Sequence, residues 1–392
     1  MRAALISIVG QPRTTESGGA RLAGKSLAQR QLAFALAAGA EQIVLLSEGA
    51  SREAAELRQM AESAGARVLT ISDGHGLLGV VRAADHLLVL APGVLPEAPI
   101  VLEMLGKGSS LLVLPAGSGI PAGFERIDAE RAWAGALVIQ GGLVERLAEL
   151  PPDIDPPAAL LRIALQAQIA ERRLPDSALK DGSWVMLRSP TDLVGAEGEW
   201  LSRNLPPVPP VRPARWLATR TLRSFSAKLL EKDRAVPALA AVAFVALAGG
   251  VVSSLLGWPV AGFVFVALGV LGKELGAGLA RLAGAPFGHD GRARTKGVAL
   301  GTLADLALAG VAVLAIDQDW LHRLFPPLIL LGLLRALRME RRSGPSALIG
   351  DRMLLALLLA IATAAGFVEV AVMALALCLV ALEMAETLKR RG

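Results

Sequence analysis

A single carboxylate, Asp305, lies within an otherwise uncharged run from Gly297 to Ile316. On one helix Gly297, Gly301 and Asp305 share a face, because they are spaced at i, i+4 and i+8. Ionisable groups are costly inside a membrane segment, and they usually face a bundle interior or a wet cavity. The spacing therefore predicts a polar cleft at Asp305, with two glycines that leave room beside the acid.

A second polar stripe precedes this run at helical spacing and contains Lys273, Glu274 and Arg281. We expect the stripe to border the cleft, close to Asp305. Because the stripe is net positive, it suits a phosphate or an anionic lipid headgroup on the cytoplasmic side. The alternative is a purely structural ion pair, in which Asp305 is the counter-ion of Arg281 or Lys273.

The elements that must hold these residues are apolar helices. The chain has 392 residues, of which 53% are hydrophobic, and residues 235–272 carry no charge. At about 1.5 Å per residue, one helix of that length would far exceed the hydrocarbon core, so we predict a break at 257–259. The run 353–384 is also too long for one crossing, and Gly366 marks its expected turn. The sequence thus predicts an all-α membrane domain of six transmembrane helices over residues 236–388, with the third and fourth near 297–316 and 321–337.

Lys and Arg flank these apolar runs and account for much of the formal net charge of +5. With six spans, every basic cluster falls on one side, which predicts a multi-pass protein of the inner (cytoplasmic) membrane with both termini cytoplasmic. Nucleic acid is not an expected partner, since aromatic residues make up only 4% of the chain and Tyr is missing. The basic clusters lie at 215–234, 292–296, 335–352 and 389–391.

Residues 1–150 alternate short apolar runs with helical patterns, which predicts an α/β domain with a mainly parallel sheet. A Gly-rich loop after the first apolar run contains Arg13, Arg21 and Lys25, which could neutralise phosphates at the carboxyl ends of the strands. A flexible surface connection is the alternative for this loop. The expected helices lie near 27–38, 51–64, 77–84 and 100–106.

The opening ALISIVG, followed by ARLAGKSLAQRQLAFALAAGAEQIVLL, resembles sugar-phosphate nucleotidyltransferases. The later segment HLLVLAPGVLPE is similar to that family's LLVLDGDVLPD, whose Asp binds the catalytic metal. At that position this chain has Gly93, preceded by Pro92. The resemblance implies a nucleotidyltransferase-like fold for residues 1–150, with Arg21 and Lys25 at the phosphate site and one hard oxygen ligand fewer for Mg²⁺.

Residues 151–213 are predicted to be a Pro-rich connector, and 214–235 a basic amphipathic helix suited to the headgroup plane. The connector contains RSPTDLVGAEGEWLSRNLPPVPP, which resembles the lead-in to the membrane domain in fused enzymes of the CDP-alcohol phosphatidyltransferase family. Trp200 to Asn204 carry this match, and it makes Arg203 a candidate phosphate-binding residue.

The predicted membrane domain resembles the same family. The family signature, D-x-x-D-G-x-x-A-R-(x8)-G-x-x-x-D-x-x-x-D, holds two divalent metals against a pyrophosphate, and its last Asp deprotonates the attacking alcohol. In this chain Gly297 and Asp305 match the third-span half, while Ala280 and Arg281 match the second-span half. The positions of the other three Asp residues are taken by Lys273, Gly276 and Gly301.

The resemblance implies a membrane protein of phospholipid metabolism that transfers a phosphatidyl or phospho-alcohol group from a CDP-linked donor to an alcohol. Asp305 would be the catalytic base, and Mg²⁺ or Mn²⁺ would be needed if the protein is active, although no set of metal ligands is identified. Lys273, Glu274 and Arg281 would bind substrate. The alternative is a catalytically inactive lipid-binding or scaffold subunit, since both domains lack their metal carboxylates. Expected partners are a membrane lipid, a CDP-linked lipid or alcohol, and either a second copy of the chain or a partner membrane enzyme.

Overall fold

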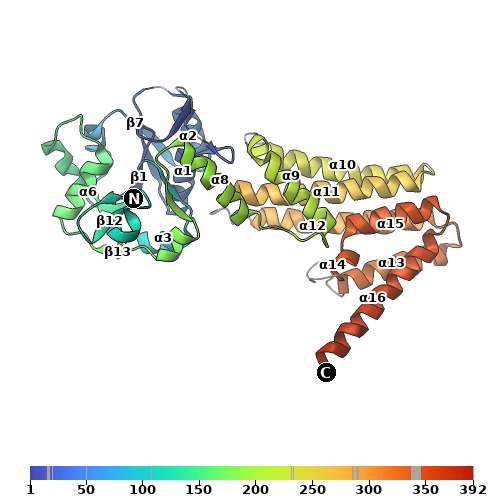
Figure 1. The fold of residues 1–392 in the computed structure, drawn as a ribbon. Helices are drawn as coiled ribbons and strands as arrows, with labels where there is room; N and C mark the ends of the chain where they lie inside the picture. The colour runs from blue at the N-terminus through green and yellow to red at the C-terminus, as the bar shows by residue number, and fades with distance from the viewer. Residues whose placement is uncertain are drawn as a thin grey trace. The chain divides into compact units, whose positions relative to one another are not determined.

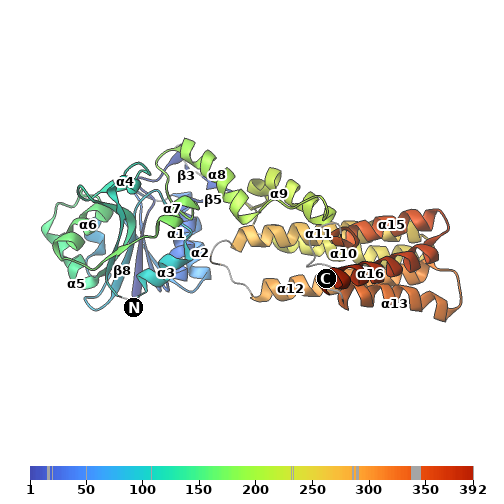
Figure 2. The ribbon, with the colours of Figure 1, turned by 60° about the horizontal axis from the view of Figure 1, so that its bottom comes forward.

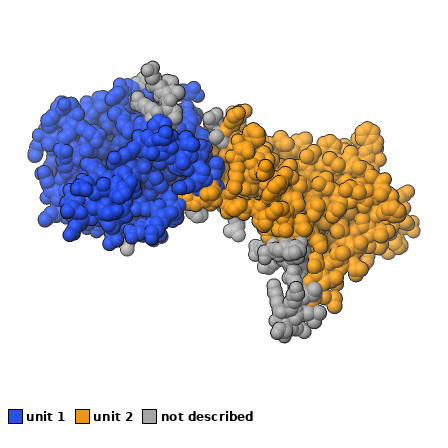
Figure 3. All heavy atoms as spheres, viewed as in Figure 1, with its two compact units in different colours: residues 1–201, 286–288 blue, residues 202–285, 289–392 orange. Residues whose placement is uncertain are grey.

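The chain forms two compact units, which Figure 3 shows in different colours. An α/β unit comprises Met1–Leu201 with Pro286–Gly288, and a helical unit comprises Ser202–Ala285 with His289–Gly392. The computed structural model describes the chain except residues 16, 17, 20, 50, 107, 231, 233, 285, 286, 288–290, 337–345 and 392. The side chains of residues 13–20, 227, 291–296, 346, 383 and 385–391 also lie outside the description.

An eight-stranded mixed sheet forms the centre of the α/β unit (Figure 2). Its order is β13-β10-β12-β8-β1-β6-β7, and β11 pairs with β12. The inner strands are buried along nearly their whole length, which explains why they read as continuous apolar runs. The strands are β1 (Arg2–Ser7), β6 (Gln42–Leu46), β7 (Arg67–Ile71), β8 (His86–Leu90), β10 (Ser110–Pro115), β11 (Glu125–Arg126), β12 (Arg131–Gln140) and β13 (Glu171–Arg173).

The sheet is less parallel than the sequence suggested. The pairs β1–β6, β1–β8, β6–β7 and β10–β13 are parallel, whereas β12 runs antiparallel to both β8 and β10. A parallel connection needs a crossover of a dozen or more residues, usually a long helix. Between β10 and β12 the chain forms only a four-residue helix, α4 (Ala116–Gly119), and β11, so β12 returns beside β10 in the opposite direction.

Three of the four predicted helices of this unit are present. They are α1 (Leu27–Ala37), α2 (Arg52–Ser63) and α3 (Pro99–Leu105). Ser26 begins α1 with a capping box, because its hydroxyl accepts from the Gln29 N–H at 3.2 Å and its own N–H donates back to the Gln29 side chain at 3.0 Å. The prediction of a helix at 77–84 was wrong. Residues Gly74–Leu77 form one 3-10 turn, and Gly79 then adopts a positive φ of 74° that ends regular structure.

The α/β unit continues to Leu201, beyond the predicted boundary at residue 150. The predicted connector of residues 151–213 is mostly part of this unit, because it supplies one strand of the main sheet and one strand of a second, two-stranded sheet. Trp184 and Trp200 of this segment are completely buried. The elements are α6 (Pro156–Gln166), β13, α7 (Asp176–Lys180), β14 (Trp184–Met186), which pairs with β9 (Val94–Pro96), and α8 (Pro190–Asn204).

The helical unit consists of long apolar helices packed side by side (Figure 1). Among the described residues, three helices are long and apolar enough to cross a membrane: α10, α11 and the Gly297–Ala315 part of α12. Shorter apolar helices cover Arg352–Ala364 and Val368–Leu382. The protein is therefore membrane-associated. The helices are α9 (Pro213–Leu230), α10 (Ala235–Leu255), α11 (Pro259–Gly284), α12 (Gly291–Ala315), α13 (Trp320–Ala336), α14 (Ser346–Ile349), α15 (Arg352–Ala364) and α16 (Val368–Arg391).

Both predicted helix breaks are present. Gly257 and Gly366 have positive φ values of 87° and 79°, which end α10 and α15 at conformations that favour glycine. Small residues then allow α10 and α11 to pack closely. A Cβ at Gly269 would lie 2.7 Å from the Leu247 side chain, and one at Gly250 would lie 2.8 Å from the Gly262 carbonyl oxygen. Such close approach of backbones is typical of helix pairs in membranes.

The predicted amphipathic helix is α9, which ends at Leu230, before α10 begins. Its face of Ala214, Ala218 and Leu222 is buried, and Leu222 approaches α11 so closely that a Cβ at Gly278 would lie 2.4 Å from it. Phe225 remains exposed on α9. The helix thus packs one face against the bundle and keeps exposed apolar and basic residues on the remainder.

Candidate anion-binding site

The helical unit contains an open pocket of about 720 Å³, which we call the cationic pocket. Its lining comes from the start of α9, the C-terminal part of α11, the N-terminal part of α12, the end of α13 and the start of α15. Four of the residues predicted from sequence, Asp305, Lys273, Glu274 and Arg281, all line it. Among the described residues, five cationic and two acidic side chains contribute to the lining, an excess of three positive charges: Arg215, Lys273, Arg281, Arg335 and Arg352 against Glu274 and Asp305.

Asp305 is buried and is held by two arginines from later helices. Its Oδ1 accepts from the Arg352 Nε at 2.9 Å, and its Oδ2 accepts from the Arg335 Nε at 3.0 Å. The expectation that Arg281 or Lys273 would be its ion-pair partner was therefore wrong, although both line the same pocket. Because each carboxylate oxygen accepts from a guanidinium, the geometry favours a counter-ion over a base that must take up a proton.

Glu274 plays a similar part on the α11 side of the pocket. Its carboxylate pairs with Lys273 at 3.1 Å and with Arg215 of α9 at 3.1 Å. Arg281, about two turns further along α11, donates from Nε to the Ala277 carbonyl oxygen at 3.4 Å. Both acids of the pocket thus orient cationic side chains around its space.

Two glycines of α12 enlarge the pocket as the sequence spacing predicted. Gly297 and Gly301 line it, and a Cβ built at either would meet no described atom within 4 Å. Neither glycine is therefore required for helix packing. Their lack of side chains instead leaves space beside Asp305, which a ligand of moderate size could fill.

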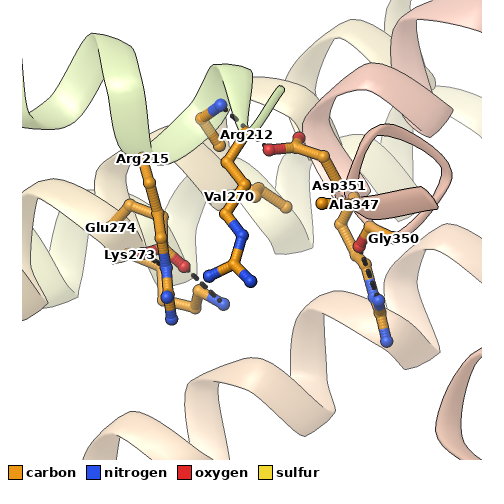
Figure 4. A pocket seen from close by; sticks show the side chains of 10 residues that line it. Arg212, Arg215, Val270, Lys273, Glu274, Ala347, Gly350 and Asp351 are labelled. Carbon is orange, nitrogen blue, oxygen red and sulfur yellow. Dashed lines mark hydrogen bonds and ion pairs between the residues drawn. The ribbon is translucent and has the colours of Figure 1, made fainter. Parts of the chain in front are cut away.

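A smaller pocket of about 60 Å³ adjoins the cationic pocket, and the two share Arg215, Lys273, Glu274 and Arg352. We call it the Arg212 pocket. Figure 4 shows the nitrogen-bearing ends of Arg212, Arg215 and Lys273 pointing toward a common space. Four cationic side chains line this pocket, one from each of four segments. They are Arg212 from the segment before α9, Arg215 from α9, Lys273 from α11 and Arg352 from α15.

Asp351, at the edge of the Arg212 pocket, joins two helix N-termini. Its Oδ1 accepts from the N–H groups of Met353 and Leu354 at 3.0 and 3.1 Å, which caps α15. Its Oδ2 accepts from the Ala214 N–H at 3.0 Å, near the start of α9. Asp351 therefore fixes the start of α9, and with it Arg212 and Arg215, against the start of α15.

The residues of these pockets do not fit a divalent metal. Mg²⁺ needs hard oxygen ligands that are not already neutralised. Both oxygens of Asp305 accept from arginines, and Glu274 is paired with Lys273 and Arg215. Within the described part of the chain, no three His, Cys, Asp or Glu side chains come together as possible metal ligands. Two-metal chemistry of the kind implied by the resemblance therefore has no ligand set at Asp305.

The strand-end site of the α/β unit is filled by the chain itself. At Gly93, where the resemblance places a metal-binding Asp, φ is +88° and a Cβ would lie 2.5 Å from the Leu187 carbonyl oxygen. The segment that follows β14 is held there, because the Leu187 N–H donates to the Gly93 carbonyl oxygen at 2.8 Å. Trp184 anchors β14 through its Nε1, which donates to the Ala134 carbonyl oxygen at 2.7 Å. A carboxylate at position 93 would collide with this segment.

Two carboxylates from other parts of the α/β unit already bind the predicted phosphate loop. Arg21 pairs with Glu56 of α2 at 3.1 Å, and the Ala23 N–H donates to Glu197 of α8 at 3.1 Å. The loop forms a tight turn between two short strands, β4 (Arg21–Leu22) and β5 (Lys25–Ser26), with Ala23 and Gly24 at positive φ. Lys25 is therefore part of a hairpin rather than of an open cradle. The side chain of Arg13 lies outside the described residues.

Trp200, the first residue of the motif match, belongs to the α/β unit. The Trp200 Nε1 donates to Glu97 at 2.8 Å, and the Arg30 guanidinium stacks 4.3 Å from the centre of the Trp200 ring and pairs with Glu97. All three side chains are buried, which makes Trp200 a core residue that attaches α8. Arg203, on the same helix, does not line either pocket of the helical unit.

Sequence reasoning missed four arginines of the site: Arg212, Arg215, Arg335 and Arg352. We interpreted three of them as topological charges outside the membrane. Arg335 and Arg352 directly border apolar runs, at the end of α13 and the start of α15. A charge inside a membrane segment is costly in free energy, which is why Asp305 was selected as a site residue. The same reasoning applies to Arg335 and Arg352 and could have identified them as site residues.

Neither a protein-family model nor a curated protein sequence matches this chain.

Proposed function

We propose that the helical unit is a membrane domain that binds the phosphate-bearing headgroup of an anionic lipid in the cationic pocket, without metal-dependent transfer chemistry. The observation that carries this proposal is the lining of the pocket, where the described side chains include five cations and two acids, and each of these carboxylates is already paired with cations. A net positive pocket beside apolar helices attracts an anion that is itself attached to acyl chains.

The position of the pocket along the helices supports a headgroup as its ligand. The chain reverses direction between α10 and α11, α12 and α13, and α15 and α16, at one end of the helical unit (Figure 1). Trp258, Trp320 and Phe367 lie exposed at these turns, as aromatic residues do at a membrane interface. The pocket is lined from the other ends of α11, α12, α13 and α15.

The finer topology is part of the same proposal. We infer six membrane crossings by α10, α11, α12, α13, α15 and α16, with both termini and the cationic pocket on the cytoplasmic side of the inner membrane. In the sequence, the basic cluster at 292–296 precedes Gly297 and Gly301 of the pocket, and the cluster at 338–342 lies between Arg335 and Arg352. Reporter fusions at Gln318 and at the C-terminus should report opposite sides. The same side for both would exclude this topology.

Lipid binding can be tested with two matched glycine variants. Gly301→Leu places a large side chain in the pocket, whereas Gly310→Leu places the same side chain on α12 where a Cβ likewise meets nothing within 4 Å, outside the pocket lining. Full-length protein in nanodiscs should retain anionic phospholipid over phosphatidylcholine in native mass spectrometry. We expect Gly301→Leu to lose this preference and Gly310→Leu to keep it. Equal retention by both variants would contradict the proposal.

An active CDP-alcohol phosphatidyltransferase is the second candidate. One observation favours it: Gly297, Asp305 and Arg281, which match the family signature, all line one pocket although they come from two helices. In this case the protein should release CMP from a CDP-linked lipid in the presence of Mg²⁺ or Mn²⁺ and an alcohol. CMP release that disappears in Asp305→Asn, at unchanged fold, would favour the transferase over the binding protein.

The scaffold role remains a proposal for the α/β unit. The filled site at Gly93 and the paired loop at Arg21 support a unit that does not transfer nucleotides. We propose that it acts through another surface, on a second copy of the chain or on a partner membrane enzyme. Co-purification of such an enzyme after crosslinking in membranes, lost when the α/β unit is removed, is the expected result.

A further inference from the structure

Three arginines of the cationic pocket, Arg215, Arg281 and Arg335, are each held by the chain through one nitrogen. The Nε of each donates to an oxygen of the helical unit, at 3.1, 3.4 and 3.0 Å respectively. Within the part of the chain that the structure describes, the terminal Nη1 and Nη2 groups of these three side chains have no hydrogen-bond or ion-pair partner. Each guanidinium is therefore oriented by the protein, and its fork of two terminal NH2 groups remains for a ligand. Such forks bind phosphate oxygens.

α11 and α12 run antiparallel along the pocket, which sets the depth of its residues. A Cβ at Gly262, near the start of α11, would lie 3.3 Å from the Val311 side chain, near the end of α12. These two positions are therefore level with each other. Asp305 precedes Val311 by six residues, so it is level with Leu268, six residues beyond Gly262.

Arg335 and Arg281 lie at opposite ends of the pocket. Arg335 is held by Asp305 at what we call the inner end, whereas Arg281 is held by the Ala277 carbonyl oxygen at the outer end. Ala277 lies nine residues beyond Leu268, which corresponds to a rise of about 13 Å along α11. Hydrogen bonds from guanidinium groups to phosphate are only about 2.7–2.9 Å long, so one phosphate group is too small to contact both forks.

Arg215 belongs to the inner end as well. It lines the Arg212 pocket together with Val270 and Arg352, and Arg352 is the second partner of Asp305. Between this inner group and Arg281, the described lining is uncharged: Ala277, Gly297, Val298, Gly301 and Thr302. The cationic pocket thus has two cationic ends joined by a neutral passage.

From this arrangement, and resting on the proposed function, we infer that the lipid in the cationic pocket carries two phosphate groups joined by a short carbon bridge. The forks of Arg215 and Arg335 bind one phosphate at the inner end, and the fork of Arg281 binds the other. The bridge lies in the neutral passage, where Gly301 leaves room for it. A diphosphate, whose two phosphorus atoms share one oxygen, is too short to reach both ends. Diphosphatidylglycerol, in which a glycerol joins two phosphates, has the required form.

The test compares diphosphatidylglycerol with phosphatidylglycerol, which has one phosphate, on the full chain in nanodiscs of phosphatidylcholine. Phosphatidylglycerol is supplied at twice the molar amount, so that both preparations contain the same number of anionic phosphates. In native mass spectrometry we expect the wild-type protein to retain diphosphatidylglycerol about tenfold or more tightly, because its second phosphate is tethered close to Arg281 and one charge-assisted hydrogen bond contributes on this scale.

Arg281→Gln should lower the retention of diphosphatidylglycerol to that of phosphatidylglycerol, whose own retention should not change because the inner end is intact. The unfolding midpoint of this variant should stay at the wild-type value, since Arg281 is exposed and its hydrogen bond lies within its own helix. Arg220→Gln removes the same charge from an exposed position of α9 outside both pockets, and it should change the retention of neither lipid. Arg335→Gln should weaken both lipids, because it removes a fork from the inner end.

Equal wild-type retention of the two lipids at equal phosphate, lost for both in Gly301→Leu, would overturn the two-phosphate inference and leave the proposed function standing. Loss of both lipids in Arg281→Gln would overturn it as well. Retention of neither lipid over phosphatidylcholine would overturn both the inference and the proposed function. Tighter retention of a polyprenyl diphosphate than of diphosphatidylglycerol would overturn the separation of the two phosphates. Displacement of diphosphatidylglycerol by soluble glycerol bisphosphate at equal concentration would overturn the assignment of a lipid as the ligand.

Discussion

Replacing Asp305 with asparagine should destabilise the helical unit, because two arginines lose their shared counter-charge. Arg352 dominates the cost: its side chain is 6% exposed and that of Asp305 is 7% exposed. Removing one partner of such a buried pair costs about 3–5 kcal/mol. Arg335 is 46% exposed, so water compensates most of its loss, at about 0–1 kcal/mol. We therefore expect a large effect of Asp305→Asn and a small effect of Arg335→Gln.

The assay is thermal unfolding of the full chain in detergent, followed by tryptophan fluorescence. Each kcal/mol shifts the midpoint of a unit of this size by about 2–4 °C. Asp305→Asn should thus lower the midpoint of the helical unit by roughly 6–20 °C. The α/β unit has its own hydrophobic clusters, and its transition should not move.

The double variant Asp305→Asn with Arg352→Gln separates a counter-ion from a base. It removes the buried positive charge along with its partner, so we expect it to recover part of the stability that the single variant loses. A single variant as stable as wild type would refute the ion-pair reasoning. So would a double variant that is no more stable than Asp305→Asn.

Three further outcomes test other parts of the structure. Gly93→Asp should destabilise the α/β unit by more than about 1–3 kcal/mol, since it combines a positive φ with the contact to Leu187, and it should not create Mg²⁺-dependent pyrophosphate release from CTP and a sugar phosphate. Gly117→Asp, in open space, should leave the unfolding midpoint almost unchanged. Hydrogen bonds from a neighbouring arginine lower the pKa of Asp128 from 3.8 to about 2, so the ionised carboxylate stabilises the fold above pH 3.8 and this contribution disappears as the pH falls toward 2. The stability difference between wild type and Asp128→Asn should therefore vanish over that interval in an acid titration monitored by circular dichroism, and a difference independent of pH would contradict the assignment. Asp351→Ala should cost about 1–2 kcal/mol in thermal unfolding, because one side chain caps α15 and also accepts from α9.

The sequence alone determined where the apolar helices lie and which face of two of them is polar. Glycines at 257 and 366 and the lengths of the uncharged runs predicted the helix ends. The spacing of Gly297, Gly301 and Asp305 predicted the side of α12 that lines the pocket. Both kinds of information are local, because backbone geometry sets the period of a helix and the length of a span.

Tertiary structure alone decided what these faces meet. The partners of Asp305 come from helices 30 and 47 residues further along the chain, whereas the sequence analysis named Arg281 or Lys273 of the preceding helix as its counter-ion. Likewise the chain returns about 90 residues later to cover Gly93, so a position that sequence described only as lacking an Asp is in fact occupied by backbone. Helical periodicity specifies the face on which a charge lies. It does not specify the neighbouring helix, because packing between distant segments determines which opposite charge comes within hydrogen-bonding distance.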